Sequence, residues 1–190
     1  MRKINKLDFI GPQFKSKLKE AMKNLDESID TLFEVATKDE KTGLYNNLFF
    51  RNIFTLELEN AKRKKPLSLI IVDIDHFKKV NDTYGHLTGD KILKSLAKLL
   101  QKQVRKNDIV ARFGGEEFFI MLPNADIERA KQIGERLRKA TENSKFNPRI
   151  TISIGVTQYK DKDTLRTMTL RADKGLYISK DQGRNRVTVQ

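Results

Sequence analysis

The order of apolar and polar positions divides the chain into a helical segment followed by alternating strands and helices. Within residues 14–36, apolar side chains recur at alternating intervals of four and three, at Leu18, Met22, Leu25, Ile29, Leu32 and Ala36. This heptad spacing is typical of a helix that pairs with another helix, although only three heptads are present and an amphipathic helix packed on its own domain fits as well. We therefore predict an N-terminal helical segment over residues 1–37 and leave its partner open.

Beyond residue 38 the apolar pattern changes. Residues 67–72, Leu-Ser-Leu-Ile-Ile-Val, form a nearly continuous apolar run of the kind found in strands buried on both faces. Further strands are predicted at 109–113, 118–122 and 150–154, and helices at 90–104, 125–141 and 164–180. This order predicts one α/β domain over residues 38–190, with helices flanking a mixed sheet.

Two adjacent glycines, Gly114-Gly115, separate two of these strands and predict a tight hairpin, because the favoured two-residue turns need positive φ. Glu116 and Glu117 follow directly, an arrangement that a solvated surface turn would also explain. Asp73 stands where the buried run ends. If the hairpin pairs beside that strand, Asp73 and Glu116 come together as a site suited to Mg²⁺, which takes one or two carboxylates plus substrate phosphates.

A second aspartate, Asp75, follows Asp73 by two residues and would share its strand face. It also precedes a short helical stretch, where a role as N-cap is a sufficient explanation. We therefore predict metal ligation for Asp73 and a structural role for Asp75.

Composition narrows the possible functions only partly. The 190 residues carry a net charge of +13, and such a charge attracts polyanions such as nucleic acid, anionic membranes or nucleotide phosphates. The lysines are scattered along helical faces, however, and a solvated basic surface explains most of them. No run approaches the roughly 20 apolar residues of a membrane helix, and residues 1–6 lack the apolar stretch of a signal peptide. Cysteine is absent, which excludes disulfides and thiolate zinc sites, so we expect a cytoplasmic protein.

Several segments together resemble one known family. Residues 112–118, Arg-Phe-Gly-Gly-Glu-Glu-Phe, resemble the signature of the GGDEF family, the diguanylate cyclases, in its GGEEF form. Residues 72–86 with Gly89-Asp90 resemble the family's other long motif almost throughout. Residues 39–46, 151–156 and 172–187 resemble its opening and closing motifs. Five ordered motifs at compatible spacing, over about residues 38–188, make the resemblance specific.

The resemblance implies a fold like the palm domain of polymerases and class III nucleotide cyclases. It implies condensation of two GTP molecules into cyclic di-GMP, in which the 3′-OH of one GTP attacks the α-phosphate of the other and no protein nucleophile is needed. It also implies two Mg²⁺ ions per active site, with Mn²⁺ as a possible substitute. Asp73 and Glu116 would bind them through carboxylates and Ile74 through its backbone carbonyl, and Glu117 would be a further ligand or catalytic carboxylate.

The same resemblance implies residues that bind the nucleotide. Asn81 and Asp90 would read guanine, with the amide toward the O6 and N3 edge and the carboxylate accepting from N1–H and from the N2 amino group, as the donors and acceptors of that base require. The β and γ phosphates would be held by Lys78, Lys180 and Arg184. The base pocket would be walled by Leu44, Phe77 and Leu93, for which core packing is an equally good explanation.

The chain departs from the family pattern at a few positions that touch neither the metal nor the guanine residues. Asn47 stands where the opening motif usually has arginine. Gly175 and Ser179 replace alanines that are usual in the last helix, and a glycine there costs about 1 kcal/mol of helix propensity.

A possible regulatory motif lies just upstream of the signature. Arg105-Lys106-Asn107-Asp108 resembles the R-x-x-D inhibitory motif of many family members. The resemblance implies that Arg105 and Asp108 bind the product cyclic di-GMP, with the arginine stacking on and hydrogen-bonding to guanine, and that Arg136 supplies a further contact.

Because one domain would hold one GTP, two domains must face each other across a two-fold axis, so the resemblance implies a homodimer. This requirement favours a dimerising role for residues 14–36, which could also be the end of a signalling helix. Three rivals remain: a catalytically weak receptor for GTP or cyclic di-GMP, a different palm-type nucleotidyltransferase, and a nucleic-acid binder. The intact signature with Asp73, Asn81 and Asp90 argues against the first two, and no nucleic-acid reading motif supports the third.

Overall fold

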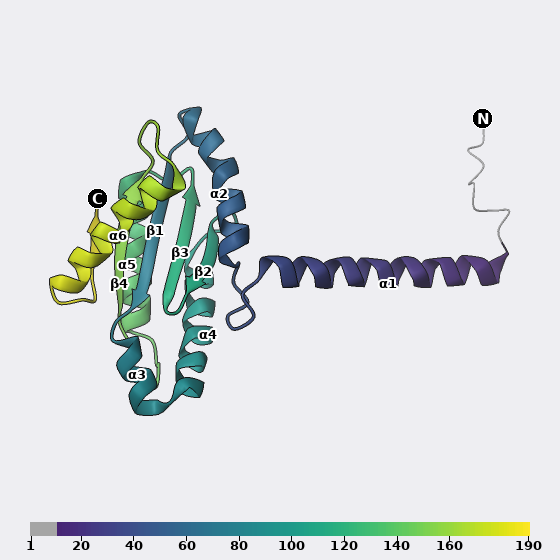
Figure 1. Ribbon diagram of the computed structural model, residues 1–190, viewed down its shortest axis with the longest axis horizontal. Coiled ribbons are helices and arrows are strands. Elements are labelled where there is room, and N and C mark those ends of the chain that lie inside the picture. The colour runs from purple at the N-terminus through teal and green to yellow at the C-terminus, as the bar shows by residue number, and fades with distance from the viewer. Residues whose placement is uncertain (1–10) are drawn as a thin grey trace. The chain divides into compact units, whose positions relative to one another are not determined.

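A computed structural model of the protein describes residues 11–190. They belong to two compact units that divide between Thr37 and Lys38. The described part of the first unit is α1 (Pro12–Thr37; Figure 1), which confirms the predicted N-terminal helix over that range. The rest of the segment predicted as helical, residues 1–10, lies outside the described residues.

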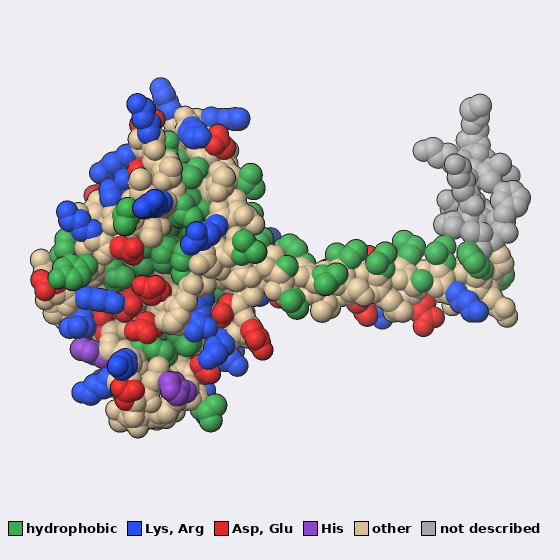
Figure 2. Space-filling model, viewed as in Figure 1, with side chains coloured by type: hydrophobic (Ala, Val, Ile, Leu, Met, Phe, Trp, Pro, Cys, Tyr) green, Lys and Arg blue, Asp and Glu red, His purple; other side chains and the backbone are tan. Residues whose placement is uncertain are grey.

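The heptad positions of α1 form an apolar seam, which consists of Leu18, Met22, Leu25, Ile29 and Leu32. These side chains are between 37% and 69% exposed in the chain, and green side chains follow the helix in Figure 2. An apolar stripe of this kind is normally covered in a folded protein. The seam is therefore a surface that a further helix could cover.

The second unit is built on a five-stranded sheet with the strand order β2-β3-β1-β4-β5. Its strands are β1 (Leu67–Ile74), β2 (Ile109–Gly114), β3 (Glu117–Pro123), β4 (Ile152–Gln158) and β5 (Val187–Val189). All neighbours are antiparallel except β4 and β5, which are parallel. This mixed sheet, flanked by helices, confirms the predicted fold class.

Helices cover both faces of the sheet (Figure 1). They are α2 (Asn47–Lys62), α3 (Phe77–Tyr84), α4 (His86–Gln103), α5 (Ile127–Glu142) and α6 (Leu165–Asp181). Side chains of α2 and α6 share one hydrophobic cluster, and those of α3, α4 and α5 share the other. Helix α2 and strand β5 were not predicted from the sequence.

Strand β1 lies at the centre and all eight of its residues are buried, as its apolar run predicts. Because side chains alternate along a strand, Leu67, Leu69 and Ile71 join the α2 and α6 cluster, whereas Ile70, Val72 and Ile74 join the cluster on the other face. Asp73 continues the first set. The alternation therefore directs the Asp73 side chain to the face that α6 covers.

Helix α6 approaches the sheet closely at the two positions where the sequence departs from alanine. A Cβ built on Gly175 would lie 2.9 Å from the Thr188 carbonyl oxygen and 3.3 Å from the Gly155 Cα atom. The Ser179 hydroxyl donates to the Ile154 carbonyl at 2.8 Å. Close contact with β4 and β5 explains both substitutions and offsets the unfavourable helix propensity of glycine.

Candidate active site

The hairpin of β2 and β3 lies beside β1, as predicted, and places Asp73 opposite Glu117 in the antiparallel register. The turn differs by one residue from the predicted glycine pair. Strand β2 includes Gly114, so the turn residues are Gly115 and Glu116, and only Gly115 has a positive φ, of 49°. Glu116 therefore sits at the tip of the turn, next to the end of β1.

A half-buried arginine holds this turn in place. The Arg112 guanidinium donates to the Gly115 carbonyl from Nε at 3.1 Å and from Nη2 at 2.7 Å. Its Nη1 donates to both carboxylate oxygens of Asp39 at 3.3 Å. Asp39 also accepts from the backbone N–H and the hydroxyl of Thr42. The first motif of the domain is thus connected directly to the turn that carries Glu116.

Asp73 and Glu116 form a pair of carboxylates whose charge is only partly compensated. Burial raises the pKa of Asp73, which is 4% exposed, even though Lys180 Nζ lies 2.8 Å from its Oδ2 atom and opposes the shift. Burial also raises the pKa of Glu116, and the charge of Asp73 raises it further. The free-energy cost of holding two negative charges close together and away from water falls when a cation binds between the two carboxylates.

The donor set at this point fits Mg²⁺. Asp73 and Glu116 supply two carboxylates, and the buried Ile74 at the end of β1 offers only its backbone carbonyl. Within residues 11–190 no cluster of three or more His, Asp or Glu side chains forms a candidate metal site. Mg²⁺ prefers sites of this kind, in which one or two carboxylates bind the ion and water and phosphate oxygens supply the remaining ligands. Basic and acidic side chains gather over this end of the sheet in Figure 2.

Asp75 has a structural environment, although it is not the predicted N-cap. The residue that precedes α3 is His76, in a left-handed conformation with a φ of 58° and no side-chain capping bond. Asp75 instead accepts from the hydroxyls of Thr151 and Ser153, both at 2.6 Å, and from the Asn185 backbone N–H at 3.1 Å. Its carboxylate joins the end of β1 to β4 and to the chain before β5.

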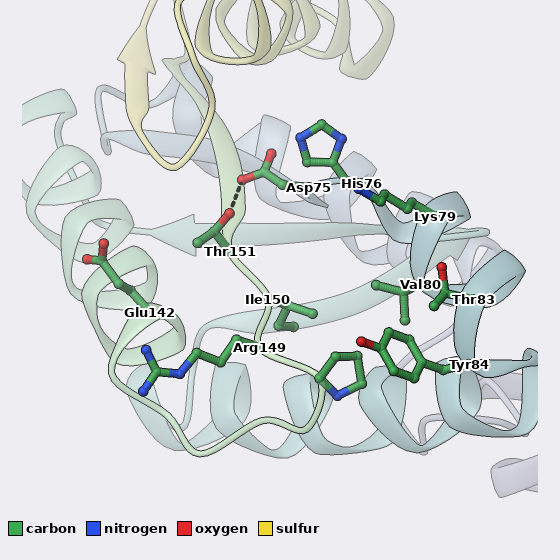
Figure 3. A pocket seen from close by; sticks show the side chains of 11 residues that line it. Asp75, His76, Lys79, Val80, Thr83, Tyr84, Glu142, Arg149, Ile150 and Thr151 are labelled. Atoms are coloured by element: carbon green, nitrogen blue, oxygen red, sulfur yellow. Dashed lines mark hydrogen bonds between the residues drawn. The ribbon is translucent and has the colours of Figure 1, made fainter.

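Asp75 also lines a cavity of about 500 Å³ between α3, the end of α5 and residues 148–151 (Figure 3). Lys79 and Thr83 contribute to it from α3. At 100° per residue these two lie on a different face of α3 from Lys78 and Asn81. The cavity is therefore separate from the residues predicted to bind the nucleotide.

The two predicted guanine-reading residues lie at the contact between α3 and α4. A Cβ built on Gly89 would lie 1.9 Å from Asn81 Oδ1, so α4 approaches the Asn81 amide as closely as a glycine allows. Asp90, the next residue, forms an ion pair with Lys41, whose Nζ lies 2.8 Å from Oδ1 and 3.1 Å from Oδ2. Lys41 is not among the residues predicted from the sequence.

The predicted apolar and phosphate-binding residues differ in exposure. The three apolar residues are in the hydrophobic core and at most 5% exposed, namely Leu44, Phe77 and Leu93. Lys78 is exposed, and Arg184 is half-buried in the loop after α6, with a φ of 63°. Lys180 occupies the space beside Asp73. Burial raises the pKa of Asp173, and the charge of Lys180 opposes that shift. Of the predicted phosphate ligands, Lys180 is thus the one in contact with the carboxylates.

The R-x-x-D residues lie in the loop between α4 and β2, slightly beyond the predicted helix end. The Arg105 backbone N–H donates to Asp108 Oδ2 at 2.8 Å. Arg136 donates from α5 to the carbonyl of Gln103, at the end of α4. Burial raises the pKa of Asp108, while Arg105, Arg136 and Arg129 lower it. Arg105 of the loop and Arg129 and Arg136 of α5 therefore gather around Asp108, and of these three Arg129 was not predicted.

Comparison with known proteins agrees with the geometry of the strand end and turn. A family model described as diguanylate cyclase, GGDEF domain, matches residues 36–186. The chain belongs to the GGDEF family of diguanylate cyclases. Diguanylate cyclase A of Treponema denticola is 40% identical to it over 171 residues, a match that covers 83% of this chain and 45% of the relative. The GGDEF chain thus spans less than half the length of that protein.

Solved structures of other GGDEF domains have the same fold. The coiled coil and GGDEF domain of DgcB from Caulobacter crescentus, solved in complex with c-di-GMP, has a TM-score of 0.83 at 28% identity and covers 93% of this chain and 99% of its own. The active GGEEF domain of a diguanylate cyclase from Vibrio cholerae has a TM-score of 0.73 at 36% identity and covers 76% of this chain and 96% of its own. No described helix of this GGDEF protein is long and apolar enough to cross a membrane.

Proposed function

We propose that this protein is a diguanylate cyclase that condenses two GTP molecules into cyclic di-GMP and releases pyrophosphate at each step. The observation that carries the proposal is the closeness of Asp73 and Glu116 at one end of the sheet, where Glu117 pairs with Asp73 and where burial and repulsion by Asp73 raise the pKa of Glu116. Membership of the GGDEF family supports it. The related Vibrio cholerae domain, which is described as active, supports it further.

The side chains around this pair have complementary roles in the proposed reaction. The 3′ oxygen of one GTP forms a bond to the α-phosphorus of the other, the bond from that phosphorus to the bridging oxygen breaks, and pyrophosphate leaves. Lys180, Lys78 and Arg184 would bind the β and γ phosphates and orient the leaving group. Glu117, exposed beside Glu116, is a carboxylate available to accept the hydroxyl proton.

Asp73, Glu116 and the carbonyl of Ile74 would hold two Mg²⁺ ions, with Mn²⁺ as a substitute. Bound there, the ions would neutralise phosphate charge and lower the pKa of the attacking hydroxyl. Asn81 and Asp90 would hold the guanine between α3 and α4, with the buried Leu44, Phe77 and Leu93 forming the wall beneath them.

We infer that catalysis requires a homodimer, because residues 38–190 offer one such site and the product contains two nucleotides. The exposed apolar seam of α1 supports pairing of two copies through this helix. Leu25→Asp should shift the protein toward the monomer in sedimentation equilibrium and lower turnover at a fixed protein concentration. Adding protein should restore turnover, since association is concentration-dependent. Unchanged mass and turnover would contradict a dimerising role.

We also infer product inhibition at the loop between α4 and β2. The cluster of Arg105, Asp108 and Arg136 supports it, and so does the c-di-GMP complex of the Caulobacter crescentus relative. Arg105→Ala should relieve inhibition by cyclic di-GMP without loss of basal turnover, whereas added GTP should not overcome it in the parent. Initial rates against GTP at several product concentrations test both statements, and inhibition that GTP fully overcomes would contradict a separate site.

The decisive experiment is incubation of the purified protein with GTP and Mg²⁺, followed by identification of the products by mass. Cyclic di-GMP and pyrophosphate are expected. A receptor of the same fold would bind the nucleotide and leave GTP unchanged, so binding without turnover would favour that alternative.

A further inference from the structure

The carboxylate of Asp90 is not free in the structure. Lys41, which lies in the loop before α2, donates from Nζ to Oδ1 at 2.8 Å and to Oδ2 at 3.1 Å. The two residues are 49 positions apart in the chain and are 53% and 34% exposed. The ion pair therefore sits at the open side of the contact between α3 and α4, where the guanine is proposed to bind.

A carboxylate with a cation beside it matches one edge of guanine. That edge presents an acceptor and two donors in a row: O6, N1–H and the N2 amino group. A carboxylate offers only acceptors and an ammonium group only donors, so Asp90 can take the two donors while a neighbouring lysine donates to O6. Adenine presents an amino group and an unprotonated N1 at the same places, which leaves both side chains without a suitable partner.

We propose that Lys41 is a selectivity residue that donates to O6 of the bound guanine while Asp90 accepts from N1–H and N2–H. This inference rests on the proposed function of the same site and adds a third polar contact to those of Asn81 and Asp90. Lys41 moves from a shared position on both Asp90 oxygens to one beside O6, and the negative charge of Asp90 keeps it near the base. The lysine thus rejects bases that lack an acceptor at the 6-position.

A role of Lys41 that only blocks Asp90 predicts a change in affinity of the opposite sign. If the lysine merely covered Asp90, guanine would have to displace it, and removing the lysine would strengthen GTP binding. Because an exposed ion pair contributes little by itself, the fold does not depend on Lys41 and its substitution should leave folding unchanged. Affinity therefore separates the two roles.

The test compares nucleotides that differ at single atoms of the base, in 3′-deoxy form so that the attacking hydroxyl is missing and binding is measured without reaction. The probes are 3′-deoxy-GTP, its 6-thio analogue, which replaces O6 by a weak acceptor, and the inosine analogue, which lacks the N2 amino group. Dissociation constants are measured by calorimetry for the full chain, for Lys41→Met and for Lys62→Met. Lys62 is a matched control because it forms a comparable exposed ion pair, with Glu59 on α2.

Lys41→Met should weaken binding of 3′-deoxy-GTP roughly tenfold, as expected for a charged hydrogen bond that is partly exposed. It should also lose most of the discrimination between the guanine and 6-thioguanine forms, while the ratio of guanine to inosine affinity stays that of the parent. Lys62→Met should match the parent throughout. Equal or tighter guanine binding by Lys41→Met, or undiminished discrimination against the 6-thio form, would overturn the proposal. A parent that binds no guanine nucleotide would instead contradict the proposed function.

Discussion

Two carboxylates at the end of β1 lie two residues apart and have opposite environments. Asp73, with Glu116 and Lys180, forms what we name the catalytic edge, where burial raises the pKa of both carboxyl groups despite the lysine. Asp75, with Thr151, Ser153 and Asn185, forms the β4 junction, where three donors satisfy the carboxylate.

The comparison distinguishes a carboxylate whose charge is satisfied within the fold from carboxylates whose charge is satisfied fully only when a ligand binds. A buried carboxylate with several hydrogen-bond donors is stabilised by the protein itself. Two adjacent carboxylates that share a single cation are stabilised fully only when a further cation binds. Four measurements test this difference.

The largest effect is expected at the catalytic edge. Glu116→Gln removes the charge but keeps the shape, so cyclic di-GMP synthesis should fall by about 10³-fold, or about 4 kcal/mol of transition-state stabilisation. Stability should not fall, because the substitution relieves repulsion with Asp73. Product formation and thermal unfolding are measured together, with the exposed Glu59→Gln as the control. Retention of parental turnover would show that Glu116 is not a metal ligand.

The β4 junction should show the reverse pattern, a loss of stability. Asp75→Ala leaves the hydroxyls of Thr151 and Ser153 and the N–H of Asn185 without their acceptor, which should lower the free energy of unfolding by about 3 kcal/mol. Urea denaturation measures the change. The exposed Asp82→Ala, on α3, is the matched control, and equal stability of the two variants would contradict a structural role for Asp75.

Magnesium should stabilise the protein in a pH-dependent way through the catalytic edge. Because the pKa values of Asp73 and Glu116 are raised from 3.8 and 4.5, these groups destabilise the fold more as the pH rises through their folded pKa values. Mg²⁺ needs the deprotonated forms, so its stabilisation should grow over the same range, to about 1.4 kcal/mol at tenfold excess over its Kd. Thermal unfolding at pH 5 and pH 8 measures this, and Asp73→Asn should remove the difference. A Mg²⁺ effect that is equal at both pH values would argue against carboxylate binding.

The smallest effect concerns the single cation of the catalytic edge. Lys180→Met leaves the buried Asp73 without its partner and raises the pKa of Asp73 further. The free energy of unfolding should therefore fall by about 1 kcal/mol at pH 8, a small value because Lys180 is partly exposed to solvent. The loss should disappear at a pH where Asp73 is protonated. A loss that is the same at low pH would show that Lys180 acts through packing and not through charge.

Much of the fold could be read from local patterns. The apolar run at 67–72 predicted the central strand, and the predicted helix at 125–141 agrees with α5 to within two residues. Helix α2 was missed, although Asn46 caps it and Phe50 and Phe54 recur at helical spacing, so its signal was present. Strand β5 has three residues and no such signal, because its place depends on pairing with β4.

In the candidate site too, some features followed from local sequence patterns and others depended on tertiary contacts. The glycine pair and the strand end sufficed to propose that Asp73 meets Glu116, since one strand pairing brings them together. The turn itself was displaced by one residue, because the extension of β2 through Gly114 depends on its pairing with Glu117. Asp75 was predicted to be an N-cap, which is wrong, and its three donors, which come from residues 151–153 and 185, could not be predicted from neighbouring positions.

Residue types, apolar periodicity and the order of motifs are properties of neighbouring positions, and they were enough for the fold class, the family and the identity of the two carboxylates. The partners that give each carboxylate its properties come from far along the chain: Ser153 is 78 positions from Asp75, Asn185 is 110 positions from it, and Lys41 is 49 positions from Asp90. Such contacts leave no periodic trace in the sequence. They arise only when β1 pairs with β4, when the chain before β5 returns to the end of β1, and when the loop before α2 reaches α4. These tertiary contacts separate a carboxylate that has its donors from one that can bind a cation.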